Sequence, residues 1–572
     1  MRPVVSRIIS TLSILFLVLP TAFVHAAHKE AVHSDKGMVA SRSKWASQVG
    51  ADILAAGGNA VDAAVAVGFA LAVTYPSAGN IGGGGFMVIH LADGTVITND
   101  HREKAPLAAT RDMYLGEDEQ VVEGLSTNTH LAVGVPGTVA GLLDVLERYG
   151  TMDRAQVIEP AIKLAEKGIR LDRDLAGSFV RRRDAFEKFP ASFAVFTKDG
   201  EAYEVGDLWQ QRDLAATLKR IKKNGRAGFY TGKTADLLVQ DMQAYKGLIT
   251  HEDLAAYESV WRDPVRGTYK GYDIVSMPPP SSGGVLLIQM LNMLESMDLA
   301  ASGYGAAATV HAMVEAERRA YADRAEHLGD PDFYPVPVEM LISKAYAKQR
   351  FADFDPQKAG VSTQIKPGLL PEESMETTHA SVMDAAGNAV AYTTTLNLSY
   401  GSKIVASGTG ILLNNEMDDF SAKDNTPNSF GLIGRRANAI EPGKRMLSSM
   451  TPTIVLKDNK PLLVTGSPGG STIITTTLQV VLNVIEHGMN LADAVGRPRF
   501  HHQWLPDRII FEQRGFSPDT VAILEGMGHK NLVEMPPQWG RGIGDANSVL
   551  RTEQGILGTA DPRNAGAAVG VP

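Results

Sequence analysis

Apolar residues at helical spacing dominate the first part of the chain that shows a clear pattern. Residues 45–74 are rich in alanine and are interrupted by a Gly-Gly-Asn sequence at residues 57–59. This pattern predicts two helices joined by a turn, with Asn59 or Asp62 near the start of the second helix.

Helical patterns return in two later stretches. Residues 140–265 consist mainly of amphipathic helical patterns, and residues 310–327 predict a further helix of the core. The run Arg181-Arg182-Arg183 lies in the first of these stretches and is interpreted as a solvated helix face.

Strand patterns are shorter and are separated by glycines. Four glycines at residues 82–85 run into the β-prone residues 86–89. A phosphate-binding loop follows a strand and opens a helix, so this order favours close backbone packing beside a site over phosphate binding.

A second β-prone region, residues 375–395, predicts a hairpin around a polar turn that contains glycine. If residues 384–387 form the loop, Thr377 lies opposite Thr394 and diagonal to Thr395, within reach of its side chain. A threonine that begins a strand beside a second hydroxyl is a candidate nucleophile.

Activation of Thr377 needs a base, and no histidine or aspartate nearby in the sequence is an obvious one. A threonine at a chain terminus can use its own α-amino group, which here requires cleavage between Glu376 and Thr377. The preceding residues 353–374 are polar, contain three prolines and have no period, which predicts an accessible loop. From the hairpin alone, threonines chosen for β-propensity are the simpler interpretation.

Composition limits the possible functions. With 44% hydrophobic and 21% charged residues, the 572-residue chain has ample core-forming material. A net charge of −9 argues against general binding to nucleic acids or anionic membranes. The absence of cysteine excludes disulfides, thiolate metal sites and cysteine nucleophiles.

The N-terminus has the pattern of a secretory signal peptide. Arg2 and Arg7 precede the apolar residues 8–18, and Val24-His25-Ala26 offers a small-residue cleavage site. We expect cleavage after Ala26 and a periplasmic or secreted protein without a membrane anchor after signal removal, because the apolar run is short for a bilayer span.

Several ordered sequence blocks carry a resemblance to a known family. The blocks are residues 57–64, 276–284, 377–379, 413–421, 447–453 and 466–471. Several ordered matches are much more specific than one motif. Together they closely resemble γ-glutamyltranspeptidases (glutathione hydrolases) of the N-terminal-nucleophile hydrolase superfamily, over nearly the whole chain after residue 35.

The resemblance implies a fold and a maturation. The fold would be α+β, a four-layer αββα sandwich, built as one intertwined body from two autoprocessed chains. Residues 1–26 would be the signal peptide, 27–376 the large subunit and 377–572 the small catalytic subunit, and the two subunits would form a heterodimer. The Thr377 hydroxyl would attack the carbonyl of Glu376, and water would then release the new N-terminus.

The resemblance also implies the roles of individual residues in cleaving γ-glutamyl compounds such as glutathione. Thr377 would attack the γ-carbonyl, and Thr395 would hydrogen-bond Thr377. Water, an amino acid or a dipeptide would accept the γ-glutamyl group. The predicted helix at residues 471–485 agrees with an oxyanion hole at its N-terminus. The implied residues are Gly469 and Gly470 for the oxyanion, Asn397, Glu416 and Asp419 for the substrate ammonium, and Arg102, Ser448 and Ser449 for its carboxylate.

A lid is implied in the polar segment of residues 421–438. Family members with a lid often carry a tyrosine there, whereas this chain has Phe430. A phenyl ring can preserve the wall of the site, but it cannot donate a hydrogen bond to Asn397. The substitution therefore bears on lid closure and on the balance between hydrolysis and transfer.

Other functions of the same fold remain open. An acylase for cephalosporin side chains such as glutaryl groups is one, although its substrates lack the α-amine that Asp419 would bind. An enzyme that processes poly-γ-glutamate is another, and a non-catalytic binding protein is a third. No cofactor or metal is expected, because His501-His502 lacks the spacing of a His-Glu-x-x-His motif.

Overall fold

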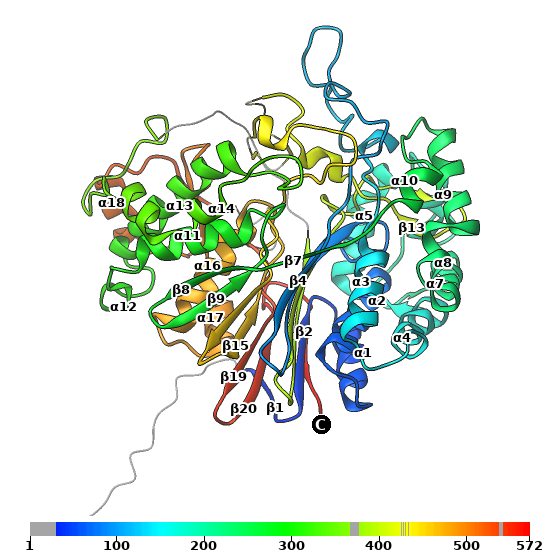
Figure 1. Cartoon of the computed structure of the whole chain (residues 1–572), viewed down its shortest axis with the longest axis horizontal. Helices are drawn as coiled ribbons and strands as arrows, with labels where there is room; N and C mark the ends of the chain where they lie inside the picture. The colour runs from blue at the N-terminus through cyan, green and yellow to red at the C-terminus, as the bar shows by residue number, and fades with distance from the viewer. Residues whose placement is uncertain are drawn as a thin grey trace, which may run out of the picture.

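The computed structural model describes residues 30–365, 377–424, 426, 428–429, 431–432, 434–536 and 542–572. Two seven-stranded sheets stack face to face, and helices cover both outer sides (Figure 1). The predicted four-layer αββα sandwich is therefore confirmed. The predicted signal peptide, Glu376 and Phe430 lie outside the described residues.

The first sheet is antiparallel, with strand order β1-β20-β19-β15-β14-β9-β8. Its strands are β1 (Val32–Ser34), β8 (Val265–Tyr269), β9 (Tyr272–Ser276), β14 (Thr453–Lys457), β15 (Lys460–Thr465), β19 (Ser548–Thr552) and β20 (Gly555–Thr559).

The second sheet is also antiparallel, with order β21-β2-β10-β11-β3-β4-β7. Its strands are β2 (Gly37–Ser41), β3 (Gly84–His90), β4 (Val96–His101), β7 (Val260–Arg262), β10 (Thr378–Asp384), β11 (Ala389–Thr395) and β21 (Ala567–Gly570).

Strands from the two sides of the predicted cleavage point are interleaved in both sheets. In the second sheet, β10 and β11 follow residue 377 but lie between β2 and β3, which precede it. In the first sheet, β14, β15, β19 and β20 lie between β9 and β1 in the same way. The two predicted subunits therefore share each sheet.

Three hydrophobic layers hold the sandwich together. The middle layer packs one sheet on the other through residues such as Phe86, Met383 and Ile454. One outer layer joins the second sheet to the helices at the right of Figure 1, and the other joins the first sheet to the helices at its left. Because both faces of each sheet are covered, the central strands are buried along their length.

The N-terminal helices follow the predicted pattern. Asn59 caps the second helix, and its side chain and that of Asp62 bond to each other's backbone in a capping box. The helices on this side are α1 (Lys44–Ala55), α2 (Ala60–Thr74), α3 (Thr138–Tyr149), α4 (Arg154–Lys167), α5 (Arg173–Phe186), α6 (Pro190–Phe196), α7 (Arg212–Asn224), α8 (Ala227–Tyr230), α9 (Gly232–Ala244) and α10 (His251–Ala255).

The helices of the other outer layer include the one predicted at residues 310–327. It is observed as α13, and its side chains are buried along almost its whole length. The helices are α11 (Gly283–Leu294), α12 (Leu299–Ser302), α13 (Ala307–His327), α14 (Val338–Leu341), α15 (Lys344–Arg350), α16 (Thr472–Ile485), α17 (Leu491–Gly496) and α18 (Pro518–Gly526).

A separate hydrophobic cluster joins α5 and α6 to the loop that follows β11, through Leu396 and Tyr400.

Short strands lie outside the two main sheets. The short strands are β5 (Ile169–Arg170) with β6 (Leu208–Trp209), β12 (Val405–Ala406) with β13 (Ile411–Leu412), and β16 (Phe500–His501) with β17 (Ile509–Phe511) and β18 (Leu532–Glu534).

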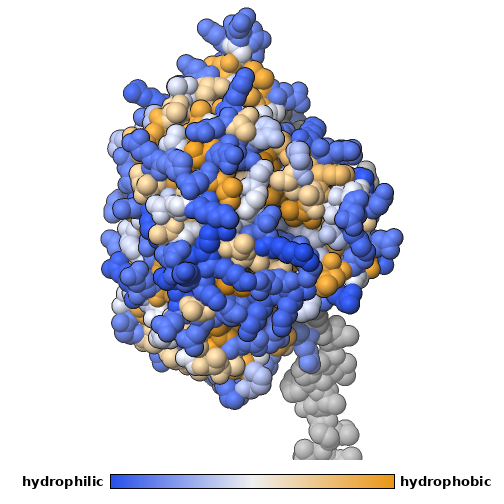
Figure 2. Space-filling model, turned by 90° about the vertical axis from the view of Figure 1, so that its right-hand side faces the viewer, coloured by the Kyte–Doolittle hydropathy of each residue, from blue (hydrophilic) through white to orange (hydrophobic). Residues whose placement is uncertain are grey.

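The surface of the helical layer at the right of Figure 1 is mostly hydrophilic, with hydrophobic residues scattered over it (Figure 2). Within the described parts of the chain, no helix combines the length and the apolar character needed to cross a bilayer.

Candidate active site

The hairpin of β10 and β11 carries the candidate nucleophile, but its register differs by one residue from the prediction. Thr378 pairs with Thr394 and Met383 with Ala389, so extension of the ladder places Thr377 directly opposite Thr395. The predicted pairing of Thr377 with Thr394 is wrong because the loop is one residue shorter than predicted: Asp384 N–H donates to Asn388 O over 3.0 Å, which leaves residues 385–387 as the loop. Gly387 has a φ of +100°, as in a three-residue loop that ends in a left-handed glycine.

Thr377 and Thr395 are both buried, and their hydroxyls meet. The Thr377 Oγ1 donates to Thr395 Oγ1 over 3.4 Å, and the backbone N–H of Asn397 donates to the same Thr395 oxygen over 2.8 Å. Asn397 has a φ of +75°, a conformation that asparagine tolerates better than most residues. This turn brings Asn397 back toward Thr377 directly after the strand.

Two glycines lie beside Thr377 at the start of α16. Gly469 has a φ of +136° and Gly470 a φ of +54°, conformations that favour glycine. Within the described chain, their backbone N–H groups donate to no other group. Unpaired N–H groups at a helix N-terminus are suited to stabilise an oxyanion.

Arg102 is fully buried at the end of β4 and is surrounded by carboxylates. Its guanidinium donates to Glu416 and to Asp419, and Glu103 Oε2 lies 3.6 Å from its Nη1. Its Nε donates to Met446 O over 3.2 Å. The groups that the resemblance assigns to opposite ends of a substrate therefore pair with each other here.

These carboxylates have unusual ionisation because they are buried together. Burial raises the pKa of Asp419 to about 6 and that of Glu103 to about 7, although Arg102 opposes both shifts. Burial also raises the pKa of Glu416 well above its ordinary value. Burial alone would lower the pKa of Arg102, but Glu416 and Asp419 raise it, so the arginine stays charged.

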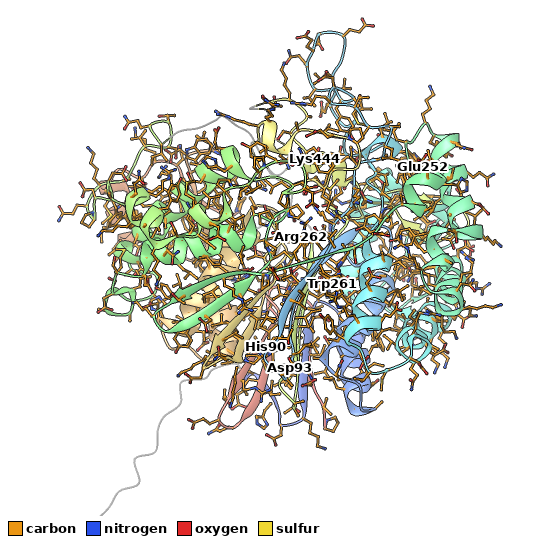
Figure 3. The ribbon with its side chains drawn as sticks, in the orientation of Figure 1. His90, Asp93, Glu252, Trp261, Arg262 and Lys444 are labelled. Atoms are coloured by element: carbon orange, nitrogen blue, oxygen red, sulfur yellow. The ribbon has the colours of Figure 1, made fainter. Side chains whose placement is uncertain are left out.

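A second ionic layer fixes the backbone of Arg102. Its N–H donates to Asp100 Oδ1 over 3.0 Å, and its carbonyl accepts from the Tyr257 hydroxyl over 2.7 Å. Arg262, near the centre of Figure 3, donates to Asp100 Oδ2 over 2.8 Å and also pairs with Asp332. These contacts hold the end of β4 in one position.

Asp418 and Asp419 point in different directions, as adjacent residues in a turn are expected to. Asp418 accepts from the Ser126 hydroxyl over 2.6 Å and from the backbone N–H of Ser429 over 3.0 Å. Asp419 faces Arg102 and accepts from Asn428 Nδ2 over 3.1 Å. The segment implied as a lid thus contacts Asp419 through Asn428.

Ser448 and Ser449 line the same pocket as Arg102 and Asp419. The structure adds an arginine that the sequence did not single out. Arg324 of α13 donates to Ser449 Oγ over 3.2 Å and to Ser282 Oγ over 2.9 Å. Since Ser449 Oγ accepts from Arg324, its own proton can point into the pocket. The sequence feature that could have indicated Arg324 is a cationic residue within a helix of the core, because a buried cation requires partners.

Two cavities meet at Thr377. The smaller, of about 20 Å³, is lined by Thr377 and by all the residues predicted for catalysis and substrate binding that the structure describes, except Gly469. The larger, of about 440 Å³, lies on the side of Gly469. Thr377 therefore lines both a nearly filled polar pocket and a larger open one.

Several side-chain contacts hold the described segment that ends at Ile365. Trp504 Nε1 donates to the carbonyls of Ser362 and Ile365 over 2.9 and 2.7 Å, and Asp507 Oδ2 accepts from Ser362 N over 3.0 Å. Arg318 of α13 donates to both Ser362 and Asp507. Residues from both predicted subunits therefore hold this segment.

One buried cluster has the donor types of a metal site. Donor atoms of His311, Glu315 and His529 lie within 4.8 Å of one another. The Glu315 carboxylate already pairs with Arg318 and Arg319, so the cluster is a hydrogen-bonded ionic network. His501 is buried and bonds to Thr475 and Gln503, and burial lowers its pKa to about 3.

Comparison with known proteins gives consistent matches along the chain. A family model described as gamma-glutamyltranspeptidase matches residues 46–571. A glutathione hydrolase proenzyme of Escherichia coli (strain K12) is 51% identical over 536 residues, which are 93% of this chain and 91% of that protein.

Solved structures agree with the sequence match. A cephalosporin acylase from Bacillus halodurans has a TM-score of 0.84 at 27% identity, over 97% of this chain and 99% of that chain. A γ-glutamyltranspeptidase chain from Helicobacter pylori has a TM-score of 0.56 at 50% identity, over 61% of this chain and 99% of that chain. The acylase shares the architecture over more of the chain, whereas the sequence is closer to the two γ-glutamyl enzymes.

Proposed function

Because the chain belongs to the γ-glutamyltranspeptidase family, we propose that it is a self-cleaving γ-glutamyltransferase and hydrolase acting on glutathione and related γ-glutamyl compounds. One observation carries the proposal. Thr377, Thr395 and the glycine pair meet at one buried point, beside a pocket lined by Arg102, Glu416 and Asp419.

Maturation begins with attack of the Thr377 hydroxyl on the carbonyl carbon of Glu376. The peptide bond breaks, an ester forms, and the nitrogen takes up the hydroxyl proton. Water then hydrolyses the ester and frees Thr377 with an α-amino group. Cleavage after Ala26 and before Thr377 would leave chains of 376 − 26 = 350 and 572 − 376 = 196 residues.

In the mature enzyme the α-amine of Thr377 acts as the base. The hydroxyl attacks the γ-carbonyl of the donor, and the Gly469 and Gly470 N–H groups stabilise the oxyanion. The leaving amine takes up the proton, and a γ-glutamyl ester on Thr377 remains. Water or an acceptor amine then attacks this ester, which yields glutamate or a new γ-glutamyl compound.

The pocket suits the free α-amino acid end of a γ-glutamyl group. Asn397, Glu416 and Asp419 would bind the ammonium, and Arg102, Ser448 and Ser449 the carboxylate, with Arg324 orienting Ser449. A space of about 20 Å³ holds about one water molecule, so donor binding requires the Arg102 ion pairs to open.

The acylase alternative is favoured less by the site. A glutaryl group has no ammonium, and its binding would leave Glu416 and Asp419 buried without a cationic substrate partner. The identity of 51% to a glutathione hydrolase proenzyme, against 27% to the cephalosporin acylase, points the same way.

We also propose how the chain is processed and where the mature protein is located. Residues 27–376 and 377–572 become the large and small subunits of a heterodimer. The signal peptide of residues 1–26 directs the protein to the periplasm or the medium and is then removed. Phe430, in the proposed lid, supplies a ring without a hydroxyl for Asn397.

The test is the intact mass of the denatured wild-type protein beside Thr377→Ala. We expect the wild type to give two chains, the smaller beginning at Thr377, and the variant to stay whole. Rates with γ-glutamyl-p-nitroanilide and glutaryl-p-nitroanilide then identify the acyl group. A wild-type chain that stays whole after long incubation would overturn the proposal.

A further inference from the structure

We propose that the larger cavity beside Thr377 is a carboxylate-binding subsite for the leaving group and the acceptor, with Arg181 and Arg182 of α5 as its anion-binding residues. The inference rests on the proposed function, because it gives the second substrate of that reaction a place and a chemistry. It assigns a role to an arginine run that the sequence pattern alone interpreted as solvated surface.

The larger cavity adjoins Thr377 but does not include the Arg102 ion pairs. Thr377 and Gly469 line it, whereas Arg102, Glu416 and Asp419 line only the smaller pocket. A donor whose γ-glutamyl end occupies the Arg102 pocket must extend its remaining part into this cavity. An attacking amine must reach the ester from the same side, and about 440 Å³ is within the range of small-molecule pockets.

The larger cavity is lined by more cationic than acidic side chains. Five cationic side chains and three acidic ones line the cavity. Arg42 is neutralised by Asp545 at 2.6 Å, and Asp172 caps α5 by accepting from Leu175 N over 2.8 Å. In the described chain, Arg181 and Arg182 have no carboxylate within ion-pair distance, so the cavity keeps excess positive charge.

Helix α5 packs tightly against the loop that follows Thr395. Phe179 and Phe186 pack on the Tyr400 ring with centroid distances of 6.2 and 5.1 Å, and Ser178 bonds to the Tyr400 hydroxyl. Tyr400 belongs to the loop that follows Thr395 and is fully buried. One face of α5 is thereby fixed to the hairpin, and the adjacent face carries both arginines into the cavity.

A buried lysine in the same loop strengthens the local positive field. Lys403 is only 7% exposed, and burial together with the charge of Arg182 lowers its pKa to about 8. An anion bound by Arg182 would relieve this repulsion between cations. A carboxylate also matches the planar donor fork of arginine better than a neutral group does.

The chemistry of transfer defines the ligand. The acceptor's neutral amine nitrogen forms a bond to the carbonyl carbon of the Thr377 ester while the bond from that carbon to Thr377 Oγ1 breaks. The amine loses a proton to the α-amine of Thr377, which returns it to the hydroxyl oxygen. A free carboxylate on the acceptor pairs with Arg181 and Arg182 and holds the amine at the ester.

The experiment compares acceptors that differ only in that carboxylate. With γ-glutamyl-p-nitroanilide as donor, kcat/KM is measured for glycylglycine and glycylglycinamide in the wild type, Arg181→Gln, Arg182→Gln and the double variant. We expect the wild type to favour glycylglycine by about tenfold or more, and the double variant to lose most of that preference.

Arg183→Gln is the matched control. Arg183 donates to Gly200 O over 2.7 Å and does not line the cavity, so its variant should keep the wild-type preference. The inference is overturned if the wild type and the double variant prefer glycylglycine over glycylglycinamide equally. It is also overturned if Arg183→Gln loses this preference as much as the double variant does. Release of p-nitroaniline by the wild type shows separately that the proposed function holds.

Hydrolysis gives a second measurement if the wild type transfers poorly. Glutathione and its C-terminal amide differ only in the leaving-group carboxylate, so their kcat/KM ratio should fall toward one in the double variant. A ratio unchanged by the double substitution would contradict the inference even in an enzyme that only hydrolyses.

Discussion

The hydroxyls of Thr377 and Thr395 lie 3.4 Å apart at the open end of one β-hairpin, with Thr377 as donor and Thr395 as acceptor. The Asn397 N–H donates to the same Thr395 oxygen over 2.8 Å. Thr395 is therefore held by the turn that follows its strand, and the direction of the Thr377 hydroxyl depends on it.

Thr395→Val tests this relationship. Valine keeps the shape and the β-propensity of threonine but offers no oxygen, so self-cleavage and kcat should each fall by about 10- to 1,000-fold, or ~1.4–4 kcal/mol. Thr395→Ser should recover most of both rates. The cleavage time course by mass spectrometry and steady-state kinetics measure them, and full activity in the valine variant would remove Thr395 from the mechanism.

Gly469→Ala should damage the oxyanion hole. An added Cβ would lie 2.3 Å from Thr472 Oγ1, so the loop must shift, and the expected loss in kcat is about 100-fold or more. Gly488→Ala is the control, because Gly488 has a φ of +56° with no atom within 4 Å of its Cβ position. It should cost ~1 kcal/mol in stability and leave kcat unchanged. Equal kcat values for the two variants would contradict the assignment.

Asp419→Asn should change the choice of acyl group. Loss of the charge facing the substrate ammonium should lower kcat/KM for γ-glutamyl-p-nitroanilide by about 100-fold, with little effect on a glutaryl donor. Asp418→Asn, which alters the neighbour that faces Ser126, should keep the wild-type ratio. In the wild type, kcat/KM should rise with pH through about 6, where Asp419 ionises. A variant that loses both donors equally would indicate a structural role.

Glu103→Gln should alter how stability depends on pH. Burial raises the folded-state pKa of Glu103 to about 7 from an ordinary value of 4.5. Between these values the folded protein binds more protons than the unfolded chain, so this group lowers stability as pH rises from about 4.5 to 7. Glutamine cannot titrate, so urea midpoints of the uncleaved Thr377→Ala protein, with and without Glu103→Gln, should diverge over this window. Parallel curves would refute the assignment.

The sequence predicted those features that depend on neighbouring residues. The Asn59 and Asp62 cap of α2 and the hairpin are local, and both are observed. The hairpin register was wrong by one residue, because the loop length depends on the left-handed conformation of Gly387, which the pattern does not report.

Contacts between distant segments were beyond the reach of the pattern. The approach of Arg324 to Ser449 and the entry of Arg181 and Arg182 into a cavity beside Thr377 depend on how helices pack against the sheets. A run of arginines on an amphipathic helix has the same sequence appearance whether it faces bulk water or a cleft. Arg102 was expected to face substrate, and its pairing with Glu416 and Asp419 became visible only in three dimensions.

The interleaving of strands affects whether the cleaved protein can refold. Once the backbone is cut before Thr377, β10 and β11 still lie between β2 and β3, but no covalent link guides them back there. Heated past its transition, the cleaved protein would have to find these partners as two separate chains, so unfolding is expected to be irreversible. Its heat stability is then described by the lifetime of the folded state, and its apparent melting temperature depends on the heating rate. Two halves expressed from separate genes should not assemble into active enzyme.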